Sequence, residues 1–408
     1  MIKFIDELKK EDLEGKKVLL RVDFNLSLLP ATSDQLPAKI EDFKVKASKE
    51  TIDYLLDNGA SVVMLSHIDP PLDSFASIID QIAKVLGGKI NLISHHDFFS
   101  GTYNPARTTP ARQSHSGGDI VQSGRLEPIT YNLLENIRQD PREVQNNERL
   151  SRDLAVNFDL YVNDAFASMH RNHASVAGVA KFLPAYAGLL IRKETENLQK
   201  AINAPQEGKI LVMGGAKIST KLPVIKNFAD KAEKILIGGA LANNFFQSQE
   251  IDVGASLVDN SVVPNILPRP GLGKNVVLPI DIVVTKDKTG NSGVLASVVR
   301  NLEPDELIVD IGPETAKRFS EIIAGSKMVI WNGPMGLNEV DGFAEGTFAI
   351  ANAVAGVPGS IIGGGDTIAA LWPEIREKYG FISTGGGAML EFLAGNKLPG
   401  LGALGYYE

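Results

Sequence analysis

The sequence predicts an α/β protein with two domains, each containing a parallel sheet of about six strands flanked by helices. The first observation is a series of short apolar runs, each bounded by turn residues and followed by a longer amphipathic segment, as in βαβ units. The second is that these runs lack polar alternation, which indicates strands buried on both faces. The third is their number, because twelve runs exceed one small sheet and suit two sheets of average size.

The apolar runs give the order of the predicted strands along the chain. In the first half they begin at Lys16, Ser61, Lys89, Ile129 and Asp159. In the second half they begin at Lys209, Lys234, Asn275, Leu307, Met328, Ser360 and Phe381.

Residues 101–130 interrupt this alternation. They are rich in Gly, Pro, Ser and Thr and lack apolar periodicity, so we expect a loop there. His95, His96 and His115 lie in or beside this segment. A metal site is one interpretation of these histidines, but without Cys or carboxylate spacing a solvated position is the more common outcome.

One amphipathic segment, residues 187–202, separates the two groups of strands. Its apolar residues at 187, 190, 191, 198, 201 and 202 form one stripe on a helix. Asn203 and the sequence APQEG then break the helical pattern before the next strand. We therefore expect an N-terminal domain over residues 1–186, a joining helix over 187–202 and a C-terminal domain over 203–395.

Composition excludes several classes of protein. A chain of 408 residues has room for two or three domains, and 44% hydrophobic with 22% charged residues argues against extensive disorder. The net charge of -8 argues against a nucleic-acid or anionic-membrane partner. With no cysteine there is no disulfide, thiolate nucleophile or Cys-zinc site. The chain starts without an apolar signal core and has no run long enough for a membrane span, so we expect a cytoplasmic protein.

Polar and basic side chains follow the predicted strands of the first half. In parallel sheets, ligands bind beyond the carboxyl ends of the strands. Arginine matches phosphate and carboxylate oxygens bidentately, so these residues together predict a site for a small polyanion. The alternative, helix caps and surface ion pairs, fits any one of them taken alone. They are Arg21, Asp23, Asn25, Ser66, His67, Glu135, Asn136, Arg138, Asn163, Asp164, His170, Arg171 and His173.

Glycines take the same positions in the second half. Glycine allows a ligand to approach the backbone, and the amides at a helix start attract phosphate, so the pattern favours a nucleotide. A strand-to-helix turn can also require glycine for steric reasons alone. The glycine positions are Gly214-Gly215, Gly238-Gly239, Gly312, Gly333, Gly363 to Gly365 and Gly385 to Gly387.

Three charged residues accompany these glycines. Lys217 and Lys221 are four residues apart, so in a helix that begins near Ser219 both ammonium groups could face one pocket. Asp366 follows the first glycine triplet and could cap a helix or hold Mg²⁺. No GxxxxGK[ST] motif is present, and the GxGxxG match at residues 400–405 lies in the tail, which argues against a P-loop protein and an NAD-dependent dehydrogenase.

Ten ordered motifs over nearly the whole chain resemble phosphoglycerate kinase. The resemblance implies two Rossmann-like domains joined by a helix around a hinged cleft, with the tail 396–408 packed back on the first domain. The motifs are RVDFN (21–25), LSH (65–67), LLENIR (133–138), YVNDAFASMHRNHAS (161–175), GGAKISTK (214–221), IGGALANNF (237–245), DIGPET (310–315), WNGPMG (331–336), IIGGGDT (361–367) and STGGGAMLEFLAG (383–395).

The resemblance also implies an activity and roles for individual residues. The family transfers a phosphoryl group reversibly between Mg-ATP and the carboxylate of 3-phosphoglycerate, in glycolysis and gluconeogenesis, and a monomer is expected. By motif, the acid substrate would contact Asp23, Asn25, Lys44, His67, Arg138 and Arg171. The transfer itself would involve Lys221, Lys44, Gly364 and Gly387, with Asp366 holding the metal. The nucleotide would contact Gly215, Ala216, Lys217, Lys221, Gly239, Pro334, Glu339, Gly363, Gly364, Gly365, Asp366 and Thr367.

Departures from the family pattern fall almost entirely in the first domain. Lys44 replaces a catalytic arginine, which exchanges a bidentate fork for a point charge. The family sequence HLGRP reads HIDPP here, so Pro70 replaces an arginine and Asp69 replaces a glycine. Ser27 replaces a proline in an unusual loop from Leu26 to Leu36. The sequence thus leaves two alternatives open, an active phosphoglycerate kinase and a catalytically weakened nucleotide-binding paralogue with a binding or regulatory role.

Overall fold

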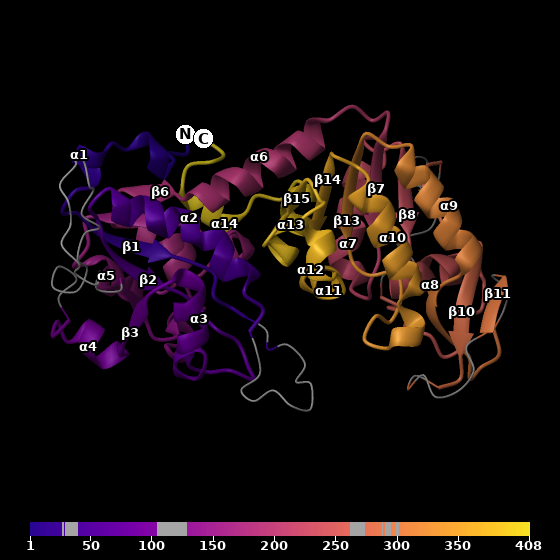
Figure 1. Ribbon diagram of the computed structural model, residues 1–408, viewed down its shortest axis with the longest axis horizontal. Helices are drawn as coiled ribbons and strands as arrows, with labels where there is room; N and C mark the ends of the chain where they lie inside the picture. The colour runs from indigo at the N-terminus through magenta and orange to yellow at the C-terminus, as the bar shows by residue number, and fades with distance from the viewer. Residues whose placement is uncertain are drawn as a thin grey trace, which may run out of the picture. The chain divides into compact units, whose positions relative to one another are not determined.

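The structure, a computed structural model, describes residues 1–26, 28, 40–103, 129–261, 274–287, 289, 295–298 and 302–408. It confirms an α/β protein with two six-stranded parallel sheets (Figure 1). Ser27, most of the loop from Leu26 to Leu36, His115 and most of the predicted loop 101–130 lie outside the described residues. In the part of the chain that is described, no helix combines the length and apolarity that a membrane crossing needs.

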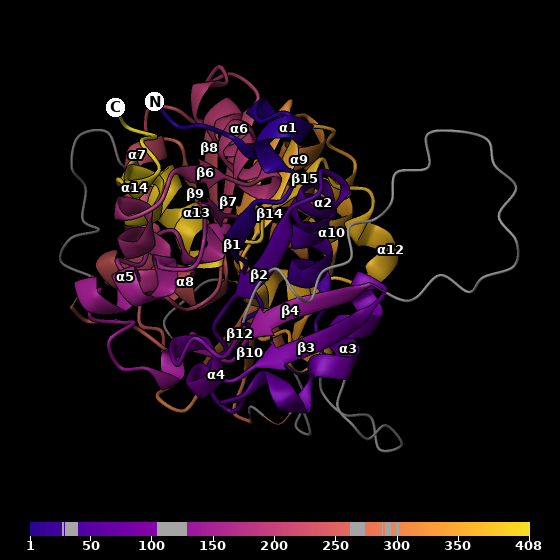
Figure 2. The same cartoon turned by 90° about the vertical axis from the view of Figure 1, so that its left-hand side faces the viewer.

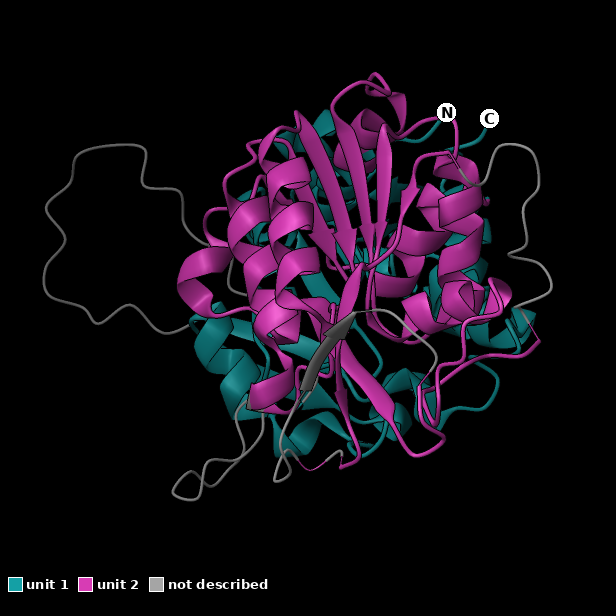
Figure 3. Ribbon diagram, turned by 90° about the vertical axis from the view of Figure 1, so that its right-hand side faces the viewer, with its two compact units in different colours: residues 1–195, 397–408 teal, residues 196–396 magenta. Residues whose placement is uncertain are grey.

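The chain forms two compact units (Figure 3). Unit 1 comprises Met1–Thr195 with Lys397–Glu408, and unit 2 comprises Glu196–Asn396. The division falls inside helix α6 (Leu189–Asn203), the segment that the sequence predicts as the joining helix. The terminal helix α14 (Pro399–Ala403) packs on unit 1, where the Gly400 N–H donates to the Met169 carbonyl over 2.9 Å.

The sheet of unit 1 is covered on both faces. Several of its strands can be seen in Figure 2. Successive side chains of a strand enter two different hydrophobic clusters, one on each face of the sheet. On β1, Val18 and Leu20 belong to one cluster and Leu19 belongs to the other. Helices α2 (Phe43–Asp57) and α3 (Ile79–Leu86) pack on the first face, and α5 (Glu148–Ala155) packs on the second. The strand order is β3 (Lys89–Ile93), β4 (Thr130–Leu134), β2 (Ser61–Leu65), β1 (Lys17–Arg21), β5 (Leu160–Asn163) and β6 (Ala185–Ala187).

The main sheet of unit 2 has the same six-stranded parallel design. Trp331 and Val329 on its central strand pack against helices α9 (Pro313–Ala324) and α10 (Glu345–Ala355). Helices α7 (Ile218–Phe228) and α13 (Gly386–Leu393) contact each other in the same unit. The strand order is β15 (Phe381–Ile382), β14 (Ser360–Gly363), β13 (Met328–Asn332), β7 (Lys209–Met213), β8 (Lys234–Ile237) and β9 (Val276–Val277).

Two of the predicted runs do not lie wholly in the parallel sheets. The run from Asn275 divides at Pro279 into β9 and β10 (Asp281–Thr285), and the run from Leu307 forms β12 (Leu307–Ile311). Strand β10 pairs antiparallel with both β12 and β11 (Leu295–Val298) in a separate three-stranded sheet. The expectation of parallel strands is wrong here, because an apolar run does not encode the direction of its partner.

The order of strands marks one switch point in each unit. In unit 1 the chain leaves β1 for β2 on one side and later adds β5 on the other. In unit 2 it leaves β7 for β8 and later adds β13 on the opposite side. Open α/β sheets bind ligands beyond the carboxyl ends of the strands at such points. The residues that follow β1 and β7 are therefore the first candidates for a site.

Asp164, at the carboxyl end of β5, caps helix α6. Its Oδ1 accepts the Leu190 N–H over 2.9 Å, and the Leu189 N–H donates to Thr51 Oγ1 over 2.9 Å. A Cβ on Gly188 would lie 2.1 Å from Asp164 Oδ1, so this contact requires glycine. Asp164 is thus the helix cap that the alternative interpretation of the strand-end residues allows.

Replacing Asp164 tests this role. Asp164→Ala should lower the free energy of unfolding by about 1–2 kcal/mol, because it leaves a helix amide without its acceptor. Asp164→Asn keeps the acceptor and should cost less. Far-UV circular dichroism in a urea titration measures the free energy of unfolding of both variants. Tryptophan fluorescence would follow unit 2 instead, because Trp331 and Trp372 are both in that unit. Equal losses in the two variants would contradict the capping role.

The same variants have a distinct pH dependence. Burial raises the pKa of Asp164 to about 8. Because an unfolded aspartate ionises at about pH 4, between about pH 4 and 8 the folded state keeps a proton that the unfolded state has lost. The free energy of unfolding should therefore fall as pH rises through this range, and Asp164→Asn should flatten that fall.

Candidate active site

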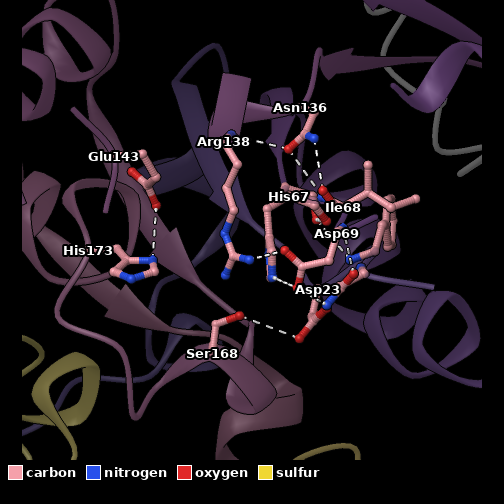
Figure 4. A network of polar contacts seen from close by, with 12 residues as sticks. Asp23, His67, Ile68, Asp69, Asn136, Arg138, Glu143, Ser168 and His173 are labelled. Carbon is pink, nitrogen blue, oxygen red and sulfur yellow. Dashed lines mark hydrogen bonds and ion pairs between the residues drawn. The ribbon is translucent and has the colours of Figure 1, made fainter. Parts of the chain in front are cut away.

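Polar side chains from three strand ends converge in unit 1 (Figure 4). Asp23 and Asn25 follow β1, His67 and Asp69 follow β2, and Arg138 follows β4 in the short helix η4 (Ile137–Gln139). Asn25 Nδ2 donates to Asp69 Oδ2 over 2.9 Å, and the Asp69 N–H donates back to Asn25 Oδ1 over 2.9 Å. The structure thus brings together residues that lie far apart in the sequence.

A buried chain of hydrogen bonds orients the His67 ring through its Nδ1 atom. Glu143 Oε1 accepts from Ser175 Oγ over 2.6 Å, and Ser175 Oγ accepts from Arg21 Nε over 3.0 Å. Arg21 Nη2 donates to His67 Nδ1 over 2.9 Å. Because Nδ1 accepts, a neutral His67 carries its proton on Nε2.

Electrostatics keep His67 neutral. Burial and the Arg21 guanidinium hold the pKa of His67 well below its usual range. The imidazole can therefore donate a hydrogen bond from Nε2 to an anion without carrying a charge at neutral pH. The sequence predicted no role for Glu143 or Ser175. Glu143 lies outside every motif, and Ser175 is only the last residue of the motif at 161–175.

Asp23 is the buried acid of this cluster. Burial alone would raise the pKa of Asp23, but Lys44, together with His67, Arg21 and the Asn25 N–H, outweighs this effect and holds the pKa below its usual range. Lys44 Nζ lies 3.4 Å from Asp23 Oδ1 and donates to the Asn25 carbonyl over 3.0 Å. In this arrangement the charge of Lys44 is directed at Asp23.

The two arginines of the cluster retain hydrogen-bonding capacity. Arg138 Nη1 contacts the Asp69 carboxylate, whereas Nε and Nη2 are buried and have no hydrogen-bond partner among the described residues. Arg171 is partly buried, and in the described part of the chain no carboxylate forms a salt bridge with it. Buried donors without partners are costly, so these groups point to an anion that binds here.

Glycine turns from three strands pack together in unit 2. Gly215 N–H donates to the Pro334 carbonyl over 2.7 Å, and Gly239 N–H donates to the Met335 carbonyl over 2.9 Å. Gly239 has φ of +58°, and a Cβ there would lie 2.5 Å from the Gly215 nitrogen. Steric need therefore accounts for these glycines, as the alternative interpretation allows.

A pocket opens beside these turns. Apolar groups including Phe246, Leu257 and Met335 form part of its wall. Glycines and several polar residues complete the lining, so apolar side chains lie next to turns without side chains. The predicted nucleotide contacts that line it are Gly215, Ala216, Gly239, Pro334, Glu339 and Asp366.

Lys221 and Lys217 differ in their surroundings. Lys221 is buried in the first turn of α7, and its Nζ donates to the Gly214 carbonyl. Burial lowers the pKa of Lys221 to about 8 even though Asp366 opposes the shift. Lys217 is the exposed N-cap of α7, which begins at Ile218, close to the predicted start at Ser219.

The two glycine triplets start two neighbouring helices. Gly364 precedes α11 (Gly365–Ala369), and Gly387 lies in the first turn of α13. A Cβ on Gly386 would lie 3.4 Å from the Gly364 Cα, so the two turns are adjacent. A Cβ on Gly365 would meet no atom within 4 Å, so the protein itself does not require glycine there.

Two of the predicted nucleotide contacts in this region have other surroundings. Thr367 Oγ1 accepts the Gly333 N–H over 2.7 Å and so joins the turns, and Gly363 ends β14.

The donor set at this turn suits a magnesium ion that is shared with phosphate. No cluster of three or more His, Asp or Glu side chains occurs in the described ranges. Asp366 offers one exposed carboxylate at the start of α11. Mg²⁺ is commonly held by one or two carboxylates, substrate phosphates and water, so a single aspartate fits.

His95, one of the histidines beside the predicted loop 101–130, lies elsewhere, in unit 1. Its Nε2 contacts the Glu135 carbonyl at 3.0 Å, which suits the interpretation of His95 as an ordinary polar residue.

Comparisons with known proteins identify the family of the chain. Residues 8–396 match the family described as phosphoglycerate kinase. A phosphoglycerate kinase of Herpetosiphon aurantiacus is 40% identical over 402 residues, which cover 96% of each chain. One of a Roseiflexus species is 41% identical over 399 residues, covering 96% of this chain and 97% of the relative.

Solved structures give the same result for the fold. The phosphoglycerate kinase from Coxiella burnetii has a TM-score of 0.75 at 31% identity and covers 100% of this chain and 99% of its own. The enzyme from Pyrococcus horikoshii has a TM-score of 0.78 at 30% identity, covering 99% of this chain and 98% of its own. The chain therefore belongs to the phosphoglycerate kinase family.

Proposed function

We propose that this chain transfers a phosphoryl group reversibly between Mg-ATP and the carboxylate of 3-phosphoglycerate, giving 1,3-bisphosphoglycerate and ADP. The observation that carries the assignment is a pair of buried donors on Arg138 that have no partner in the described part of the chain. They lie beside the neutral His67, in a unit separate from the glycine-lined pocket. Both reactants are anions, and each unit offers one site of matching charge.

The acid substrate is assigned to unit 1. Its phosphate accepts from Arg138 Nε and Nη2 and from Arg171, since guanidinium groups match phosphate oxygens. His67 Nε2 and Asn25 Nδ2 donate to the remaining oxygens. Asp23 stays ionised and orients Lys44, so the ammonium remains beside the site.

The nucleotide is assigned to unit 2. The apolar wall of the pocket takes the base, Glu339 accepts from the ribose, and the turns at Gly215, Gly239 and Pro334 border the bound nucleotide. The phosphates lie against the amides at the starts of α11 and α13, which include Gly363 to Gly365 and Gly387. Thr367 supports this turn through its bond to Gly333.

Charge stabilisation accounts for the chemistry. In phosphoryl transfer the negative charge spreads over the three equatorial oxygens, and positioning with electrostatic stabilisation lowers the barrier. Lys221 and Lys217 supply positive charge at the nucleotide site of unit 2, Lys44 supplies it at the acid site of unit 1, and the amides of Gly364 and Gly387 donate to phosphate oxygens. A magnesium ion held by Asp366 would neutralise further charge on the nucleotide phosphates.

A coupled assay tests the proposal. Purified protein with Mg-ATP and 3-phosphoglycerate is coupled to glyceraldehyde-3-phosphate dehydrogenase, and NADH oxidation is followed. We expect turnover that depends on both substrates, with the protein acting as a monomer. Absence of turnover, with Mg-ADP still bound in calorimetry, would instead support the nucleotide-binding paralogue, which the loss of the family arginines at positions 44 and 70 keeps as the second candidate.

A further inference from the structure

The carboxylate of Asp69 lies where an anionic substrate would bind. Its Oδ1 contacts Arg138 Nη1, its Oδ2 accepts from Asn25 Nδ2 over 2.9 Å, and Oδ2 lies 3.9 Å from His67 Nε2. These are three of the groups to which the proposed function assigns the acid. A carboxylate of the protein itself therefore contacts the same guanidinium and the same Asn25 amide that the acid needs, and it lies beside His67 (Figure 4).

We propose that Asp69 is a specificity-determining residue of the acid site, an internal anion that holds Arg138 and Asn25 until the substrate displaces it. The inference rests on the proposed function. Charge repulsion grows with the charge of the ligand, so Asp69 penalises a phosphorylated acid more than an acid with a single negative charge.

The surroundings leave Asp69 room to move. Its side chain is 35% exposed, whereas the Arg138 side chain is 16% exposed, so the carboxylate is the more accessible member of the pair. Asp69 also lines a cavity with Asn25, Leu26 and Leu72, into which the carboxylate can rotate. The Arg138 backbone N–H donates to Asn136 Oδ1 over 3.1 Å, which fixes the segment from which the guanidinium extends.

Removing this charge should strengthen binding of the acid. Asp69→Asn keeps the size and one acceptor oxygen, and Asp69→Ser removes the group from Arg138. Each should lower the Kd for 3-phosphoglycerate about tenfold, as expected for loss of one charge at hydrogen-bond distance from the ligand's partners. The Kd for glycerate, which carries one charge, should fall less.

The experiment measures these Kd values by calorimetry on the whole protein, together with KM and kcat in the coupled assay. Asp73→Asn is the matched control, because Asp73 is an exposed carboxylate four residues along the same loop. We expect Asp69→Asn to lower KM for 3-phosphoglycerate with kcat within about twofold, and Asp73→Asn to change neither.

The outcomes separate this inference from the proposed function. Wild-type turnover with an unchanged or raised Kd in both Asp69 variants would overturn the inference alone, because it would mean that Asp69 only positions Arg138. An equal gain for glycerate and 3-phosphoglycerate would also overturn it. If neither wild type nor Asp69→Asn binds 3-phosphoglycerate, both this inference and the proposed function are wrong.

Discussion

Lys221→Ala should lower kcat for phosphoryl transfer by about 10²–10³-fold, the usual effect of removing one preorganised charge from a transition state. Lys221 is buried at the start of α7, with its ammonium against the Gly214 carbonyl and in electrostatic contact with Asp366. A buried ammonium loses little energy in reorganisation when charge develops on the transferred group. The Kd for ADP should change little, because the pocket wall and the glycine turns remain intact.

The matched control is Lys226→Ala, which removes an exposed lysine from the same helix. It should leave both kcat and the Kd for ADP unchanged. If Lys221→Ala kept near-normal turnover, the role assigned to Lys221 would be wrong.

The pH profile gives an independent measurement of the same group. Burial lowers the pKa of Lys221 to about 8, so the free protein loses this positive charge as pH rises through that value. In the wild type kcat/KM for ATP should fall above about pH 8, since this ratio reports groups of the free enzyme. Lys221→Ala should lack that fall, and an identical profile in both proteins would contradict the assignment.

Arg138→Ala should raise KM for 3-phosphoglycerate by about 100-fold or more. The variant removes two charge-assisted hydrogen bonds, each of about 1.5–3 kcal/mol, and every 1.4 kcal/mol is a factor of ten in affinity. It also leaves the Asp69 carboxylate without its cation, which adds repulsion toward the acid. KM for ATP should stay within about twofold, because the nucleotide is assigned to the other unit.

Two further variants make this prediction sharper. Arg142→Ala is the control, since Arg142 follows in the same segment but pairs with Asp140 outside the cluster. Arg138→Lys should restore only part of the affinity, because an ammonium lacks the planar fork that binds phosphate oxygens bidentately. Parallel increases in KM for both substrates would indicate a general structural defect instead.

Much of the fold could be predicted from local sequence. The runs at β1, β2, β7 and β13 are continuously apolar because both faces of each strand are covered by helices, and this burial is visible residue by residue. Strand β6 escaped prediction because three residues are too few to show a period, and β10 and β12 were assigned to the wrong kind of sheet because pairing direction leaves no mark on an apolar run.

The acid site shows the same limit. The motif around Arg21 and Asp23 and the strand-end position of His67 indicate an anion site, because polar residues directly after buried strands must lie at one sheet edge. The sequence shows that Asp69 adds a negative charge beside the site, but it does not show that Asp69 contacts Arg138 and Asn25.

The sequence by itself determined two parallel sheets, the residue types at their carboxyl ends and the family of the chain. Only the tertiary structure decided that Ser175 joins Glu143 to Arg21, although Arg21 and Ser175 are 154 residues apart. Arg21 in turn sets the tautomer of His67 by donating to its Nδ1. It likewise decided that Asp69 pairs with Arg138, 69 residues along the chain. The physical reason is that side-chain hydrogen bonds act over about 3 Å, and only the order of strands in the sheet brings such distant residues within that reach.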